Sequence, residues 1–122
     1  MATILVVEDN AANMTLAVYL LETTGHKVLT ARDAEGGLAS ARAEHPDLIL
    51  MDIQLPGMDG LEATALLKQD DATRSIPVVA LTALAMKGDE ERIRAAGCDG
   101  YIAKPMAYKE FLATVEAHLR SA

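Results

Sequence analysis

The sequence predicts an α/β fold: a doubly wound, five-stranded parallel sheet in a single domain that spans residues 1–122. Two observations support this prediction. Short apolar, β-branched runs alternate strictly with longer helical segments, five times along the chain. The strand runs are also almost continuous in apolar residues, as in parallel strands that helices cover on both faces. Because crossover connections are right-handed, such a chain folds as an open parallel sheet, with 2-1-3-4-5 as the expected strand order.

The expected strands are short runs rich in valine, isoleucine, leucine and alanine. They cover residues 3–7, 27–31, 47–51, 76–81 and 100–103. Pro77 falls at the start of the fourth run, where its missing N–H can be tolerated.

Helical segments follow each of these runs. They extend from about residue 10 or 13 to 24, from 33 to 43, from 61 to 70, from 87 to 96 and from 107 to 120. Either Asn10 or Asn13 can cap the first helix, and Asp33 caps the second. Gly25 lies just past the end of the first helix, and Pro46 stops the second.

The three later helices differ in character. The third follows a dense turn segment over residues 54–60. The fourth, over residues 87–96, is almost entirely charged in its first half, so few apolar residues anchor it. The last helix carries an apolar stripe made of Tyr108, Phe111, Leu112, Val115 and Leu119.

The composition limits the functional classes. A net charge of −7 argues against general affinity for nucleic acid or for anionic membranes. The single cysteine, Cys98, forms no internal disulfide, which fits a reducing cytoplasm. No signal peptide precedes the first strand, and no apolar run reaches the roughly 20 residues of a membrane span. We therefore expect a cytoplasmic protein without membrane insertion, with its scattered histidines, His26, His45 and His118, at the surface.

Acidic side chains follow two strands that the expected order makes neighbours. Glu8 and Asp9 come after the first strand, and Asp52 comes after the third. Two carboxylates about 4 Å apart repel by roughly 4 kcal/mol at an effective dielectric constant near 20. Such a pocket is either partly protonated or built for a divalent metal ion. Because Thr82 and Lys104 end the next two strands, the five residues together indicate a site that moves a phosphoryl group.

The segments that carry these residues resemble the receiver domain of two-component response regulators. The matching segments are residues 6–10 (VVEDN), 51–60 (MDIQLPGMDG), 80–83 (ALTA) and 104–105 (KP), and the resemblance spans residues 4–119. Residues 85–94, followed by Gly97 and Cys98, further resemble bacterial single-domain regulators of the DivK type.

The resemblance implies a flavodoxin/CheY-like (βα)5 fold and a phosphorylation site. Asp52 would accept a phosphoryl group from a histidine kinase, a hybrid kinase or a histidine phosphotransfer protein. Mg²⁺, or Mn²⁺ in its place, would be bound by Asp9, by Asp52 and by the backbone carbonyl of Gln54, with Glu8 acting through water. The protein would phosphorylate itself and slowly dephosphorylate itself, without being a turnover enzyme.

The remaining family roles fall on four positions around the acceptor. Lys104, Thr82 and the Ala83 N–H would bind phosphoryl oxygens, and Tyr101 would rotate as part of a switch. The switch would change the surface formed by residues 87–96, 100–103 and 107–120, where a downstream protein would bind. The kinase or phosphotransfer partner would contact Asn13, Met14, Ala17, Pro105, Met106 and Ala107.

Alternative interpretations remain open at this point. The chain could be a receiver excised from a hybrid kinase or a larger regulator, or a receiver that has lost phosphorylation. A phosphatase of the haloacid dehalogenase class also uses an aspartyl nucleophile, but it needs a second aspartate at the position that Gln54 occupies. A flavodoxin-like cofactor binder is disfavoured because the first loop, residues 8–13, is acidic.

Overall fold

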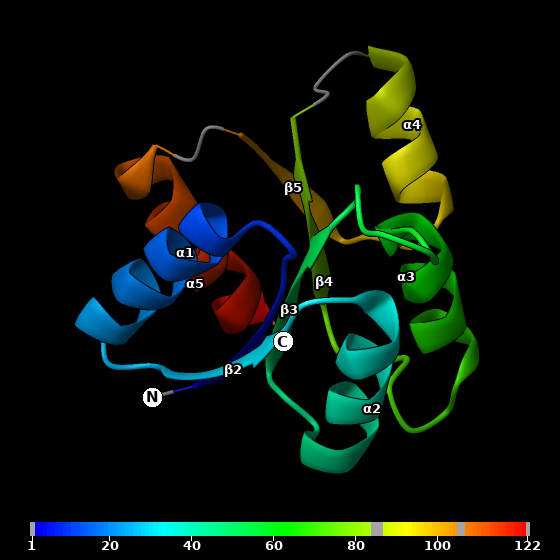
Figure 1. Cartoon of the computed structure of the whole chain (residues 1–122), viewed down its shortest axis with the longest axis horizontal. Helices are drawn as coiled ribbons and strands as arrows, with labels where there is room; N and C mark the ends of the chain where they lie inside the picture. Colours follow the sequence, from blue (N-terminus) through cyan, green and yellow to red (C-terminus); the bar gives the residue numbers. More distant parts are fainter. Residues whose placement is uncertain (1, 84–86, 105–106, 122) are drawn as a thin grey trace.

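Five parallel strands form one sheet in the order β2-β1-β3-β4-β5 (Figure 1). The computed structural model describes residues 2–83, 87–104 and 107–121. The strands are β1 (Thr3–Val7), β2 (Lys27–Ala31), β3 (Leu48–Asp52), β4 (Val78–Thr82) and β5 (Gly100–Ala103). The helices are α1 (Ala11–Thr23), α2 (Ala34–Glu44), α3 (Gly60–Gln69), α4 (Lys87–Ala95) and α5 (Tyr108–Ser121). The predicted fold class and strand order are confirmed.

Helices cover both faces of the sheet, α1 and α5 on one side and α2, α3 and α4 on the other (Figure 1). Alternate side chains of β1 show how the strands serve both layers. Ile4 and Val6 pack with the helices α1 and α5, whereas Leu5 and Val7 pack with α2 and α3. The strands β1, β3 and β4 are therefore buried on both faces, which explains their continuous apolar sequences.

Local signals set most of the helix boundaries. Asn10, rather than Asn13, caps α1, because its side chain accepts a hydrogen bond from the Asn13 N–H at 3.0 Å. Asp33 caps α2 as predicted. The helix α3 begins one residue earlier than expected, at Gly60, because Asp59 caps it through the Glu62 N–H.

The strand β3 is displaced by one residue from the prediction and ends on Asp52. Asp47, the expected first residue, instead exchanges two hydrogen bonds with Thr3: its N–H donates to the Thr3 carbonyl, and its carboxylate accepts from the Thr3 N–H. The strand β4 begins at Val78, two residues after the expected start, and ends on Thr82. As a result, Asp52 is the last residue of β3 and Thr82 is the last residue of β4.

Two expectations about side-chain exposure are wrong. Tyr108 was assigned to the apolar stripe of α5, but it is exposed. His26 was assigned to the surface, but its side chain is 8% exposed and lies 2.8 Å from the Glu116 carboxylate. Its Nδ1 accepts a hydrogen bond from the Ala2 N–H at 3.2 Å, so the ring joins the turn after α1 to β1 and α5.

The helix α4 has a single buried apolar residue, Ile93, in the part of it whose side chains are described. Intrahelical ion pairs join Arg92 to Asp89 and Arg94 to Glu90. The expectation of weak anchoring is confirmed. Within the described residues, no helix is long and apolar enough to cross a membrane.

Gly60 is expected to tolerate no side chain, because a Cβ at this position would lie 2.0 Å from the backbone oxygen of Asp52. We expect Gly60→Ala to lower the free energy of unfolding by about 3 kcal/mol, as overpacking against rigid backbone does. Urea denaturation measures this loss. In the control Gly36→Ala, the added Cβ would meet a side-chain atom, Asp33 Oδ1, at 3.0 Å rather than rigid backbone at 2.0 Å, so we expect a smaller loss. An equal loss in both variants would contradict the role assigned to Gly60.

Candidate functional site

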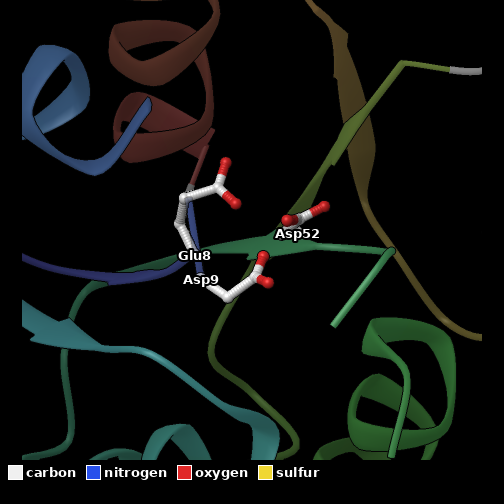
Figure 2. Close-up of side chains that lie close together, drawn as sticks. All are labelled: Glu8, Asp9 and Asp52. Atoms are coloured by element: carbon white, nitrogen blue, oxygen red, sulfur yellow. The ribbon is translucent and has the colours of Figure 1, made fainter. Parts of the chain in front are cut away.

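The three acidic side chains predicted to converge do so at the carboxyl edge of the sheet. Glu8 and Asp9 follow β1, and Asp52 ends β3, which pairs directly with β1. Figure 2 shows the three carboxylates grouped beside the sheet edge. One oxygen from each lies within 4.8 Å of the others.

Two of these carboxylates are withdrawn from solvent. Glu8 is 1% exposed and Asp52 is 3% exposed, whereas Asp9 is open to water. The turn after each strand holds its carboxylate in place. The Gln54 N–H donates to Asp52 Oδ1 at 3.0 Å, and the Asn10 N–H donates to Glu8 Oε2 at 3.4 Å.

Lys104 supplies the positive charge that partly balances this pocket. Its Nζ lies 2.7 Å from Glu8 Oε1 and 3.3 Å from Asp52 Oδ1. The backbone positions it, because the Lys104 N–H donates to the carbonyl of Thr82 at the end of β4. The sequence placed Lys104 at this edge but gave no sign that Glu8 would be its nearest partner.

The carboxylates share their protons unequally. Burial, together with the neighbouring carboxyl of Glu8, raises the pKa of Asp52 to about 7. Burial also opposes ionisation of Glu8, but the adjacent Asp52 carboxyl and the Lys104 ammonium stabilise its charged form more strongly, so the pKa of Glu8 is lowered. Near neutral pH, the proton that the pair retains therefore resides mainly on Asp52.

The residues present fit a divalent cation. Glu8 Oε1 is buried and makes no hydrogen bond among the described residues, although the Lys104 ammonium is close to it. Asp9 faces solvent, so an ion held here would keep several waters, as Mg²⁺ prefers. Such an ion would counteract the burial and the carboxylate repulsion that together raise the pKa of Asp52.

Thr82 and Tyr101 lie on one face of the sheet, on adjacent strands. Thr82 ends β4 and is buried, and it pairs in register with Ala103, while Tyr101 pairs with Ala80. Tyr101 is half-buried and packs against the core cluster beneath α3 and α4. Ala83 follows Thr82 and is exposed.

The expected partner-binding residues separate into three groups. Asn13 and Met14 are half-buried, and Ala107 is exposed. Pro105 and Met106 lie outside the described residues. Ala17 lies on the sheet-facing side of α1 and is fully buried. It offers no surface to a partner, so the expectation that it contacts the kinase or phosphotransfer protein is wrong.

The outward face of α1 is instead formed by side chains that the sequence analysis did not select. Leu16 is 39% exposed and Tyr19 is 64% exposed. Periodicity predicts an apolar face made of Met14, Ala17, Val18 and Leu21, and these residues are indeed buried or half-buried, but it gives no sign that large apolar residues would also lie on the outer face.

A cleft of about 200 Å³ adjoins the site on the side of α4. It is lined by Ile53, Gln54, Asp59, Leu61, Thr82, Asp89, Arg92 and Ile93. Nothing in the sequence distinguishes Arg92 as a functional residue, because Arg92 follows three acidic residues in a charged helix, as solvated side chains often do.

The raised pKa of Asp52 predicts how stability depends on pH when divalent ions are removed. A raised folded-state pKa means that the stabilising contribution is present below the unfolded-state pKa and is lost as the pH rises through about 7. We therefore expect Asp52→Asn, which cannot ionise, to be more stable than wild type by about 2 kcal/mol at pH 8 in EDTA.

Urea denaturation at pH 5 and pH 8 measures this difference. Asp71→Asn, which removes an exposed carboxyl far from the pocket, serves as the control and should match wild type at both values. A stability difference at pH 8 that is no larger than at pH 5 would contradict the assignment.

The family model for the response regulator receiver domain matches residues 4–116. The chain is 50% identical over 120 residues to the polar-differentiation response regulators DivK of Brucella ovis and Brucella melitensis, covering 98% of this chain and 98% of each relative.

Solved structures agree with this match. The receiver domain of a sensor histidine kinase from Pseudomonas aeruginosa PAO1, with a magnesium ion coordinated in its active-site cleft, is 36% identical with a TM-score of 0.90 over 97% of both chains. The chemotaxis response regulator CheY4 of Vibrio cholerae is 26% identical with a TM-score of 0.92 over 97% of this chain and 98% of that one.

Receiver domains bind Mg²⁺ at an acidic site and interact with histidine kinases or phosphotransfer proteins and with downstream targets. The chain belongs to the response regulator receiver domain family and is a component of two-component signalling rather than a turnover enzyme.

Proposed function

We propose that the protein accepts a phosphoryl group on Asp52 from a phosphohistidine of a histidine kinase, a hybrid kinase or a histidine phosphotransfer protein. One observation carries the proposal: a buried aspartate at a strand end shares a pocket with two further carboxylates and lies 3.3 Å from a lysine ammonium. This arrangement suits attack by one anion on another, which needs charge neutralisation more than bond-making help.

The step is a phosphoryl transfer between two nucleophiles. A carboxylate oxygen of Asp52 attacks the phosphorus atom, and the P–N bond to the donor imidazole breaks. The electron pair of that bond stays on the imidazole nitrogen, which takes up a proton. The product is an acyl phosphate on Asp52. Its slow self-dephosphorylation reverses the charge change: water attacks phosphorus, the P–O bond to Asp52 breaks, and inorganic phosphate and a proton leave.

The pocket residues divide the remaining work. Asp9, Asp52 and the backbone carbonyl of Gln54 would hold Mg²⁺, or Mn²⁺ as a substitute, with Glu8 contributing through water. When bound, the ion supplies the charge neutralisation that in-line transfer requires. Asp52 attacks in its ionised form, and after the transfer Lys104 pairs with the phosphoryl oxygens in place of the carboxylates of Glu8 and Asp52.

Thr82, with the neighbouring Ala83 N–H, binds further phosphoryl oxygens and links them to the switch. Thr82 and Tyr101 share one face of the sheet, so an inward shift of the threonine side chain vacates space that the tyrosine ring can enter. The result is a population shift between two packings of α4, β5 and α5, and a downstream protein reads that surface.

The phosphoryl donor docks on α1 and the loop that precedes α5. Asn13, Met14 and Ala107 remain in the proposed contact, as do Pro105 and Met106 by their place in the chain. Ala17 is not part of it, because it is buried.

Asp52→Asn is expected to abolish labelling by a phosphorylated kinase or by acetyl phosphate, because an amide cannot form the acyl phosphate. Labelling with radioactive phosphate, followed by denaturing gel electrophoresis, measures this loss. Circular dichroism confirms that the variant is folded, and Asp71→Asn should label like wild type. Equal labelling of Asp52→Asn and wild type would refute the acceptor assignment, and an unlabelled wild type would indicate a receiver that has lost phosphorylation.

Asp9→Ala is expected to weaken Mg²⁺ binding by about tenfold or more, because it removes the solvent-facing ligand of the set. Isothermal titration calorimetry of the metal alone, at pH 8, measures the change. Asp71→Ala removes the same charge far from the pocket and should bind Mg²⁺ like wild type. An unchanged affinity in Asp9→Ala would count against this metal site.

A further inference from the structure

The cleft between α4 and the turn after β3 connects the acceptor site to a helix outside the pocket. Gln54, whose N–H donates to Asp52 Oδ1, lies on one wall, and Thr82 lies at the inner end. Asp89 and Arg92, from the first two turns of α4, line the opposite wall. Asp52 does not itself line the cleft, but its neighbour Ile53 and its hydrogen-bond partner Gln54 do, so a group that extends from Asp52 can reach a space that side chains of α4 also border.

Phosphorylation leaves this site with an excess of negative charge. With Mg²⁺ bound, the carboxylates of Glu8, Asp9 and Asp52 are balanced by the divalent ion and the Lys104 ammonium. An acyl phosphate carries about two negative charges in place of the single charge of the carboxylate it replaces. One further positive charge is needed to restore the balance.

Arg92 carries the one positive charge among the described residues that line the cleft. Its Nη1 donates to Asp89 Oδ1 at 3.1 Å, and its side chain is 64% exposed. The Asp89 side chain is 21% exposed, but because the guanidinium itself is largely solvated, an ion pair three residues apart on a helix contributes little free energy here. The guanidinium can therefore exchange Asp89 for a more highly charged acceptor at small cost, and its planar fork suits phosphoryl oxygens.

We propose that Arg92 binds the phosphoryl group in the phosphorylated state. Its guanidinium leaves Asp89 and reaches across the cleft to the phosphoryl group on Asp52, which draws α4 toward the site. The proposal rests on Asp52 being the phosphoacceptor. Because Ile93 is the buried apolar residue of the described part of α4, little packing opposes this movement. Arg92 thus couples the charge on Asp52 directly to a helix of the output surface.

The test measures binding of beryllofluoride, a stable mimic of the phosphoryl group on a carboxylate, by calorimetry in saturating Mg²⁺. We expect Arg92→Met to weaken the affinity about fivefold, near the upper end of what a partly exposed charge pair contributes. Arg92→Lys should show an affinity between those of Arg92→Met and wild type, because it keeps the charge but loses the planar fork. Asp89→Asn should strengthen the affinity because it frees the guanidinium.

Arg94→Met is the matched control. Arg94 lies on the same helix, is paired with Glu90 at 3.4 Å and is 60% exposed, but does not line the cleft. We expect its affinity to stay within twofold of wild type. An equal loss of beryllofluoride affinity in Arg94→Met would show that both substitutions merely destabilise α4, and it would overturn the proposal. An unchanged affinity in Arg92→Met would overturn it as well.

The outcome for Asp52 separates this inference from the proposed function. Beryllofluoride must bind wild type and not Asp52→Asn if Asp52 is the acceptor. Failure of wild type to bind would overturn the acceptor assignment itself, and the Arg92 proposal with it. Binding to wild type and Arg92→Met alike would overturn only the role of Arg92.

Discussion

The repulsion among three carboxylates at one edge of the sheet is the constraint on which the site depends. Glu8 and Asp52 are buried together, and a single lysine ammonium lies against both. Without a cation, burial and the neighbouring Glu8 raise the pKa of Asp52 to about 7, so part of the repulsion is relieved by a proton. Every ligand of this pocket, whether metal ion or phosphoryl group, therefore acts by changing the balance of charge rather than by filling a preformed apolar cavity.

The fold supplies the rigidity that such a pocket needs. Like-charged groups held by flexible segments would move apart, but β1 and β3 are fixed neighbours within a core that is buried on both faces. Gly60 adds a further restraint, because α3 begins in direct contact with the backbone of Asp52. Packing of the sheet core thus offsets the repulsion among the carboxylates of Glu8, Asp9 and Asp52 and holds them close together.

The cap at Asp33 was predictable from the sequence, as were the strand order and the five residues at its carboxyl edge, whereas the first cap was narrowed only to Asn10 or Asn13. Features set by distant partners were not predictable. His26 is buried because Glu116, ninety positions away, accepts its ring N–H. Ala17 was misplaced because the resemblance implies that the first helix contacts the partner without showing which of its residues are exposed, and Tyr108 because it lies at the edge of the apolar stripe of α5, at the first residue of the helix. The pairing of Lys104 with Glu8 likewise depends on side-chain reach across strands, which strand order leaves open.

The helix α1 has a consequence for how the protein chooses its partners. Glu22 is its one charged side chain near neutral pH, and Leu16 and Tyr19 stand on its outer surface. A phosphoryl donor that docks on this helix, as proposed above, gains almost no electrostatic attraction from the helix itself. The part of its selectivity that α1 provides would then come from the shape of exposed side chains such as Leu16 and Tyr19, and that part should change little between dilute buffer and concentrated salt.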